Sequence, residues 1–154
     1  MRDLGKMGET TFNFWCADAG LIANGSQIDR TGWDFFVEFA FDSGVDPSEI
    51  HKSAFECKVQ VKATDKRERK VSVSLSSLRR LITAQMPAFF VFIEFDGSES
   101  AQRAFVVHVD NNLTSTVLKR LHEIEQSDED NRFNKRKMTI HYDDCHLMRS
   151  LDGK

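Results

Sequence analysis

The stretch FECKVQVKA, residues 55–63, decides the fold of this chain, because its side chains alternate between apolar and polar. The odd positions hold phenylalanine, cysteine, two valines and alanine, whereas the even positions are all polar. Side chains on a β-strand point alternately to opposite faces of the sheet. The stretch therefore predicts a strand with one face in a core and a polar row on the other, formed by Glu56, Lys58, Gln60 and Lys62.

A second predicted strand precedes it, in TGWDFFVEFAF, residues 31–41. Its apolar side carries Trp33, Phe35, Val37 and Phe39, and Asp34 lies on the opposite side. If the two strands are neighbours, the Asp34 carboxylate stands close to the polar row. A carboxylate, an amide and an ammonium group side by side suit a divalent metal ion and a phosphodiester.

An aspartate followed on the next strand by Glu/Asp/Gln-x-Lys resembles the PD-(D/E)XK superfamily of restriction-endonuclease-like nucleases. Asp34 matches the first acidic position, Gln60 the middle position and Lys62 the lysine. The flanking segments GETTFNFW (8–15) and VSLSSLRRLITAQMPAFFVFIEFDG (73–97) look like bacterial nuclease domains related to Mrr-type and anti-phage defence effectors. The resemblance covers roughly residues 5–110.

The resemblance implies a metal-dependent DNA endonuclease that serves a bacterial defence or restriction system. Its cofactor would be Mg²⁺, with Mn²⁺ as the alternative, and its substrate double-stranded DNA. The expected catalytic residues are Asp34, Gln60 and Lys62. Metal ligands would come from the Asp34 carboxylate, the Gln60 side-chain oxygen, the Val61 backbone carbonyl and the Glu9 carboxylate. Lys62 would position the attacking water or help to deprotonate it.

Several assignments within this motif stay open at the level of sequence. Glu56-Cys57-Lys58 is a competing E-x-K, but the apolar positions centre the strand on Val59 and Val61 and favour the later register. Glu9 shares a helix face with Phe12 and Cys16, although a glutamate in a first helical turn is also favoured by the helix dipole. Glu38 and Asp29 are weaker candidate acids.

Basic residues concentrate between positions 58 and 80, where eight basic and two acidic residues give a net charge of +6 in a chain of net charge −3. Such asymmetry is typical of a surface that meets phosphate backbones. A charged turn kept polar for solubility is the alternative. The predicted nucleic-acid-binding residues are Lys58, Lys66, Arg67, Arg69, Lys70, Arg79 and Arg80.

Length and composition predict one domain over residues 1–154, with a nuclease-like core at about 5–110 and an extension at 111–154. The longest apolar run, residues 88–93, is too short for a bilayer, and the N-terminus has no signal-peptide pattern. Cys16 and Cys57 fall on apolar faces, which indicates buried thiols in a reducing cytosol. The prediction is a cytoplasmic protein without a membrane partner; a homo-oligomer or an associated sensor protein stays open.

Periodicity and turn residues predict the order α-β-β-β-α-β-β-α, an α/β fold with a mixed sheet flanked by helices, as in a restriction-endonuclease-like core. The predicted helices span 9–19, 76–83 and 114–126, the last with Val117, Leu118, Leu121 and Ile124 inward. The predicted strands span 31–41, 55–64, 70–75, 88–95 and 104–109. The 55–64 and 70–75 strands are expected to form an antiparallel meander. Short strands at 21–23 and 138–142 and a final helical turn at 145–151 complete the prediction.

Two other observations set limits on function. The terminal HYDDCH, residues 141–146, mixes zinc-ligand types, but the chain offers no second half with ligand spacing, so a surface turn is favoured. Because Gln60 replaces a carboxylate, a catalytically inactive module that binds nucleic acid or a protein is the main alternative function. A resolvase or an RNA-directed nuclease on the same fold is the other.

Overall fold

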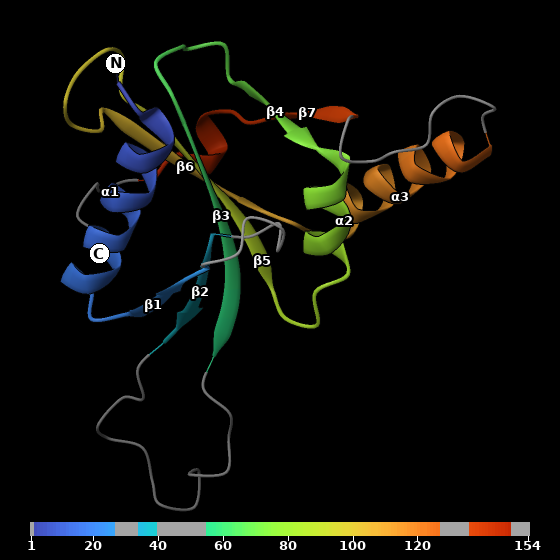
Figure 1. Ribbon diagram of the computed structural model, residues 1–154, viewed down its shortest axis with the longest axis horizontal. Coiled ribbons are helices and arrows are strands. Elements are labelled where there is room, and N and C mark those ends of the chain that lie inside the picture. Colours follow the sequence, from blue (N-terminus) through green and yellow to red (C-terminus); the bar gives the residue numbers. More distant parts are fainter. Residues whose placement is uncertain (1, 27–33, 40–54, 127–135, 149–154) are drawn as a thin grey trace, which may run out of the picture.

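A computed structural model of the protein describes residues 2–26, 34–39, 55–126 and 136–148. It is a mixed α/β structure built on a five-stranded sheet of order β1-β2-β3-β5-β6, with a separate two-stranded sheet (Figure 1). The elements are α1 (Leu4–Asp18), β1 (Ile22–Gly25), β2 (Phe35–Glu38), β3 (Glu56–Thr64), β4 (Lys70–Ser74), α2 (Leu75–Ile82), β5 (Ala88–Glu94), β6 (Arg103–His108), α3 (Asn111–Gln126), β7 (Lys137–His141) and the short 3₁₀ turn η2 (Asp144–His146).

The centre of the large sheet is the parallel pair β3 and β5, in register from Lys58 opposite Ala88 to Thr64 opposite Glu94. The antiparallel pairs β1–β2 and β2–β3 extend it on one side, and β5–β6 on the other. Every residue of β5 except Phe89 is buried, as expected for an unbroken apolar run on an interior strand. The predictions of strands at 55–64 and 88–95 are confirmed.

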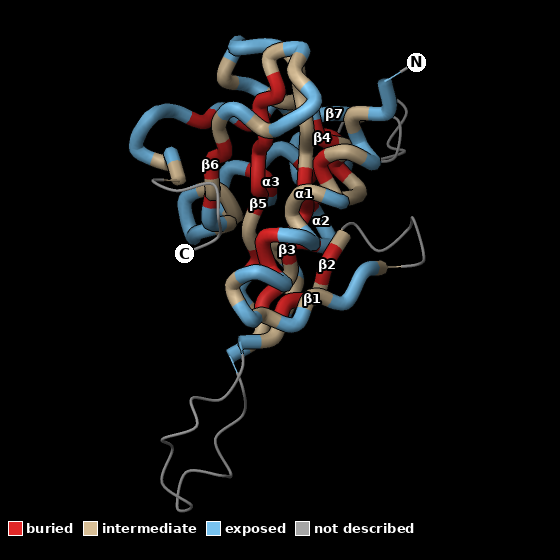
Figure 2. Tube along the Cα trace, turned by 90° about the vertical axis from the view of Figure 1, so that its left-hand side faces the viewer, coloured by how far each residue is buried: buried red, intermediate tan, exposed pale blue. Residues whose placement is uncertain are grey.

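The two faces of the large sheet carry separate apolar clusters. Helix α1 covers one face, where Trp15 and Cys16 pack with Val59, Val61 and other odd-numbered residues of β3 and β5. Helices α2 and α3 cover the other face, on which Phe90 and Phe92 are fully buried (Figure 1). Burial follows the inner strands through the middle of the molecule (Figure 2). The alternating residues of 55–63 therefore point to these two faces in turn, the odd positions toward α1 and the even positions toward α2 and α3.

Helix α1 lies unusually close to β3 because Gly8 has no side chain. A Cβ atom at Gly8 would stand 2.9 Å from the Cβ of Ala63 and 3.4 Å from a methyl of Val61. Such distances are shorter than the van der Waals contact between carbon atoms. The glycine therefore sets the spacing between the helix and the strand, and with it the position of Glu9, the next residue.

The caps of the helices correct two predicted boundaries. Helix α1 begins at Leu4 rather than residue 9, because the Asp3 side chain accepts a hydrogen bond from the Lys6 N–H at 3.0 Å. Helix α2 begins at Leu75 rather than residue 76, because Ser74 is its N-cap. Helix α3 begins at Asn111, and its Leu118 is 51% exposed, so the prediction that Leu118 faces inward is wrong.

The largest correction concerns β4. The strand forms at Lys70–Ser74 as predicted, but it pairs with β7 and not with β3, so the expected meander is wrong. The chain turns away after Thr64 through a bend in which Arg69 adopts a positive φ of 58°. Val73 of β4 and Ile140 of β7 then pack above Phe90 and Phe92. The place beside β3 is taken by β5 on one edge and β2 on the other.

The remaining expectations have mixed outcomes. Cys16 and Cys57 are buried free thiols, as predicted, and no helix in the described part of the chain is long and apolar enough to cross a membrane. Gly20 ends α1 with a positive φ of 73°. Asp29, Trp33, the ends of the predicted 31–41 strand, the 127–134 loop and the residues after Met148 lie outside the described residues.

Candidate functional site

Asp34 stands at the start of β2, where its carboxylate is held against the backbone of β3. Its Oδ2 accepts a hydrogen bond from the Val61 N–H at 2.6 Å, and its own N–H donates to the Val59 carbonyl at 2.9 Å. Both bonds lie in the plane of the sheet, so the carboxylate sits at the edge between the two strands. The N–H and C=O of one residue in an antiparallel pair face the same neighbour. The Val61 carbonyl is therefore directed to the same edge as Asp34.

A polar cleft of about 330 Å³ opens between α1 and this edge. Glu9 and Asp34 both line it, so the structure brings together the two carboxylates that the sequence assigned to a metal site. The other lining residues come from α1, from the end of β1 and from β2: Lys6, Thr10, Asn13, Gly25, Ser26 and Phe35. Helix α1 contributes Glu9 because Gly8, one residue earlier, is pressed against β3.

Gln60 and Lys62 lie on the opposite face of β3 from α1. In the parallel register Gln60 is beside Phe90 and Lys62 beside Phe92, both of which belong to the cluster under α2 and α3. Gln60 is only 6% exposed, and its Oε1 is buried without a hydrogen-bond partner in the described part of the chain. Lys62 is half-buried. The predicted site is thus divided: Asp34 and Glu9 line the polar cleft, whereas Gln60 and Lys62 do not.

The register of the motif follows from the contact of Asp34. Its hydrogen bond goes to Val61, which lies between Gln60 and Lys62, and not to Cys57 of the competing E-x-K. Glu56 lies at the far end of the β2–β3 pair, directly opposite Glu38. Glu38 is four residues from Asp34 along β2 and does not line the polar cleft. The geometry therefore favours the later register, as the sequence did.

The predicted basic patch does not form one surface. Lys58 lies at the start of β3, and Arg79 and Arg80 lie in the last turn of α2, toward the same end of the sheet (Figure 1). Lys66, Arg67, Arg69 and Lys70 follow the other end of β3. Basic residues that are close in sequence are thus divided between the two ends of the strand.

Two arginines of the patch belong to a structural ion-pair cluster that the sequence did not reveal. Arg67 binds Asp96 at 2.6 Å. Arg69 binds Asp144 at 2.8 Å, approaches Glu94 at 3.5 Å, and places its guanidinium 4.4 Å from the ring centre of Phe105. These contacts direct both guanidinium groups to partners within the chain. They weaken the assignment of Arg67 and Arg69 to nucleic-acid binding.

Glu94 is the centre of this cluster and is fully buried. It accepts from the Arg103 Nε at 2.8 Å and from the Tyr142 hydroxyl at 3.0 Å. Arg103 also donates to Asp96, and hydrogen bonds from Arg67 and Arg103 hold the pKa of the Asp96 carboxyl below its ordinary value. Burial first, and then the charge of Glu94, raises the pKa of Tyr142. The only sequence signal was a glutamate at the end of an apolar strand.

The terminal HYDDCH forms the turn that the sequence favoured. Asp143, Cys145 and His146 offer ligand atoms within 4.8 Å of one another, the only such group among the described residues. The same atoms hold the turn together: Asp143 Oδ1 accepts from the Cys145 N–H at 2.9 Å, and His146 Nδ1 accepts from the Asp143 N–H at 3.1 Å. Asp143 and Cys145 are exposed. The arrangement is explained by capping alone.

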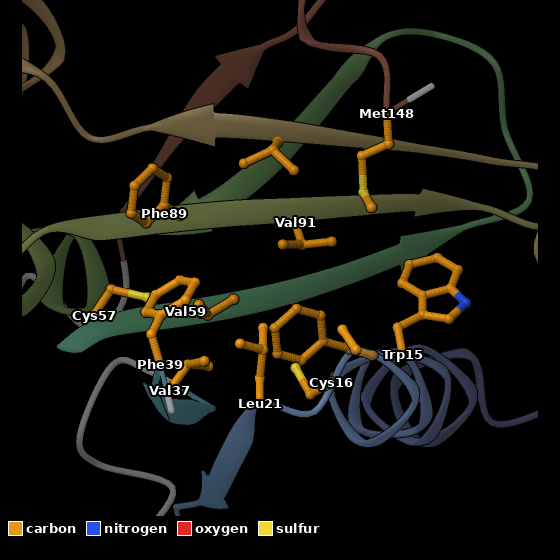
Figure 3. A pocket seen from close by; sticks show the side chains of 13 residues that line it. Trp15, Cys16, Leu21, Val37, Phe39, Cys57, Val59, Phe89, Val91 and Met148 are labelled. Carbon is orange, nitrogen blue, oxygen red and sulfur yellow. The ribbon is translucent and has the colours of Figure 1, made fainter. Parts of the chain in front are cut away.

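An apolar cavity of about 240 Å³ lies on the α1 face (Figure 3). Its walls include Trp15, Cys16, Phe39, Cys57 and Met148. Burial raises the pKa of both thiols, that of Cys16 to about 11, so they are neutral and poor nucleophiles at pH 7. Among the described residues, the lining of this cavity includes no acid or base suited to hydrolysis, and the polar cleft at Asp34 is the better candidate for chemistry.

No protein-family model matches the chain, and a search of curated proteins finds no similar sequence.

Proposed function

We propose that this chain is a metal-dependent nuclease of the PD-(D/E)XK type that hydrolyses phosphodiester bonds of double-stranded DNA. The observation that carries the proposal is the carboxylate of Asp34 fixed at the β2–β3 edge by the Val61 N–H, with the Val61 carbonyl on the same edge. The lysine one residue later completes the motif. The order of the elements also supports it, because an antiparallel β1-β2-β3 set is followed, after β4, by helix α2 and the parallel β5.

The residues present fit a divalent metal ion. Mg²⁺ prefers oxygen ligands and retains several waters, so a few protein oxygens suffice. Asp34, the Val61 carbonyl and Glu9 would hold the ion, and the Gln60 Oε1 is a buried acceptor that lacks a partner in the described part of the chain. A buried acceptor without a partner is unfavourable by about 1–3 kcal/mol. Because Gln60 lies on the other face of β3 from Glu9, the two residues would have to reach the ion from opposite sides of the strand.

A bound metal ion would neutralise phosphate charge and lower the pKa of the attacking water. The rest of the chemistry falls to Lys62, whose ammonium group makes no ion pair with another described residue. It would position the water and the scissile phosphate by donating hydrogen bonds. The water oxygen then bonds to phosphorus as the bond to the leaving sugar oxygen breaks.

The direct test is nicking of supercoiled plasmid with Mg²⁺, with Mn²⁺ and with EDTA. Asp34→Asn is the best variant, because an amide oxygen still accepts from the Val61 N–H while the charge is lost. We expect metal-dependent nicking by the native protein and none by Asp34→Asn. Asp18→Asn, at the exposed end of α1, is the matched control and should retain activity. Full activity in Asp34→Asn would exclude this site.

Gln60 favours a second candidate function, a nuclease-fold module that binds nucleic acid without cutting it. A neutral amide holds Mg²⁺ less strongly than a carboxylate does. If the native protein binds DNA but nicks it with neither metal, Gln60→Glu should raise metal affinity in calorimetry. Labelled RNA in the same cleavage assay separates an RNA-directed nuclease from a DNA-directed one.

The role in anti-phage defence rests on the sequence resemblance, and it is tested in cells. Expression of the native chain should lower the plating efficiency of phages, and expression of Asp34→Asn should not. Equal protection by both would indicate that defence does not depend on this carboxylate.

A further inference from the structure

The β4–β7 ribbon has one apolar and one polar face. Val73 and Ile140 are buried on its inner face, with Val71 and Met138 packed beside them. On the outer face every fully exposed side chain can donate a hydrogen bond, and these residues are Lys70, Ser72, Lys137, Thr139 and His141. The alternation is what a strand pair half-buried on one side requires. Alternation does not explain why the outer residues are hydrogen-bond donors, since acidic residues would make the face equally soluble.

The register joins these outer residues into one surface. Lys70 is opposite His141, Ser72 is opposite Thr139, and Lys137 is opposite Ser74. Residues directly opposite in an antiparallel pair share a face. The two lysines therefore stand at diagonally opposite ends, with the two hydroxyl groups between them. Neither strand contains a carboxylate, so the ribbon is a local positive surface on a chain of net charge −3.

Several nearby polar groups that do not contribute are engaged elsewhere, although Glu68, two residues before Lys70, is an exposed carboxylate. Ser74 accepts from the Ser77 N–H at 3.3 Å as the cap of α2. Asp144, which follows β7, is held by Arg69 at 2.8 Å, and Asp143 accepts from the Cys145 N–H. The carboxylates closest in sequence after β7 are thus bound in the turn.

We propose that the outer face of the β4–β7 ribbon binds the sugar–phosphate backbone of duplex nucleic acid. The lysines are separated by about four residues of strand, or about 13 Å, close to the width of about 12 Å of the DNA major groove. They can reach phosphates on the two sides of a groove while Ser72 and Thr139 donate between them. The face carries no phenylalanine, tyrosine or tryptophan, and His141 is its single aromatic side chain, so it lacks the row of rings on which successive unpaired bases stack; this favours a duplex over a single strand. This surface lies outside the Asp34 cleft, and binding to it needs no cleavage.

The test measures affinity for a short duplex of random sequence by fluorescence anisotropy, in EDTA and over a range of salt concentrations. The variant is Lys70→Glu with Lys137→Glu. Its matched control is Lys119→Glu with Arg120→Glu, two exposed residues of α3 that give the same change in net charge. We expect the ribbon variant to bind at least about tenfold more weakly, with a log–log salt slope shallower by about 1.8, or 0.9 for each lost phosphate contact. The control should retain the native slope.

A second variant separates the hydroxyl groups from charge. Ser72→Ala with Thr139→Ala should weaken binding a few-fold without changing the salt slope, because a neutral donor releases no counterion. Thermal melts establish that each variant is folded.

Three outcomes would overturn the proposal. They are equal weakening by the ribbon and control variants, an unchanged affinity and slope in the ribbon variant, or binding of the native protein to anionic lipid vesicles but not to duplex. The nuclease proposal fails separately: a native protein that binds through the ribbon but never nicks DNA leaves this inference standing.

Discussion

Two groups of carboxylates among the described residues differ in the partners that surround them. At the end of β5 and just after it, Glu94 and Asp96 each accept from the guanidinium of Arg103, and Arg67 and Arg69 add further positive charge. At the β2–β3 edge, the hydrogen bond to Asp34 comes from a backbone N–H, and Glu9 faces the same cleft. The first group is compensated by fixed positive charge within the fold.

The difference separates structure from function. Glu94 is fully buried and pairs with Arg103 and Arg69, and breaking such a buried pair destabilises the fold. Asp34 and Glu9 instead line a polar cleft, and carboxylate oxygens in such a cleft are of the type that divalent cations prefer. By residue type alone, the Glu94–Asp96 group and the Asp34–Glu9 group are both acidic. The groups differ because arginines pair with the first, whereas the second lines a cleft.

The largest expected effect is on catalysis at Lys62. Lys62→Met should reduce the rate of plasmid nicking by about 10²–10⁴-fold, the range for loss of a proton-transfer or water-positioning group. Its melting temperature should stay close to that of the native protein. Lys58→Met, four residues earlier on the same face, is the control and should be far less harmful. If the Lys58 variant is dead and the Lys62 variant active, the register of the motif is the earlier one.

The next effect is on stability at Arg103. Arg103→Met removes the closest cation from the fully buried Glu94 and should lower the free energy of unfolding by about 3 kcal/mol, the low end of the range because Arg69 remains. Urea unfolding measures this value. Arg120→Met, which breaks an exposed pair with Glu123 on α3, should change it by less than about 1 kcal/mol. Similar losses in both variants would show that the Glu94 cluster is not special.

A smaller effect is expected in acid. Since the folded-state pKa of Asp96 is lowered, its contribution to stability is present above the unfolded pKa of about 4 and is lost as the pH falls through the folded value. The difference in melting temperature between the native protein and Asp96→Asn should therefore shrink from about pH 5 to about pH 2. A constant difference over that interval would mean that Asp96 does not carry the linkage.

The smallest effect is expected at Arg67, whose side chain is 67% exposed although it binds Asp96. Arg67→Met should cost less than about 1 kcal/mol of stability. Because this guanidinium is held by Asp96, duplex affinity should change less than in the ribbon variant. A loss of affinity equal to that caused by reversing Lys70 and Lys137 would restore Arg67 to the nucleic-acid surface.

The sequence predicted what depends on local pattern. The strict alternation of residues 55–63 gave β3 and its two faces, and the unbroken run at 88–94 gave the buried β5. Each of these inferences needs only the period of the element and one neighbouring strand. Asp34 and Glu9 line one cleft, but their placement in a common site was an expectation of the family resemblance and not of the local pattern.

What the sequence did not predict depends on partners distant along the chain. Lys70–Ser74 reads as a strand, but nothing local says that it pairs with residues 137–141 rather than with β3. Arg69 reads as one member of a basic run, yet its partners are Glu94 and Asp144. The sequence also did not predict that Glu9 and Gln60 lie on opposite faces of β3. The alternation shows which residues of β3 share a face, but not which of the two faces helix α1 covers.

Gly8 has a consequence for which ion the cleft would prefer. A methyl group there would need about half an ångström more room between α1 and β3 to reach normal carbon–carbon contact, since the present gap to Ala63 is 2.9 Å. Bonds from oxygen to Mg²⁺ are about 2.0–2.1 Å long and those to Ca²⁺ about 2.3–2.6 Å, a difference of the same size. In the proposed metal site, Gly8 would thus influence ion selectivity without offering a ligand atom. Gly8→Ala would shift the preference from Mg²⁺ toward Ca²⁺.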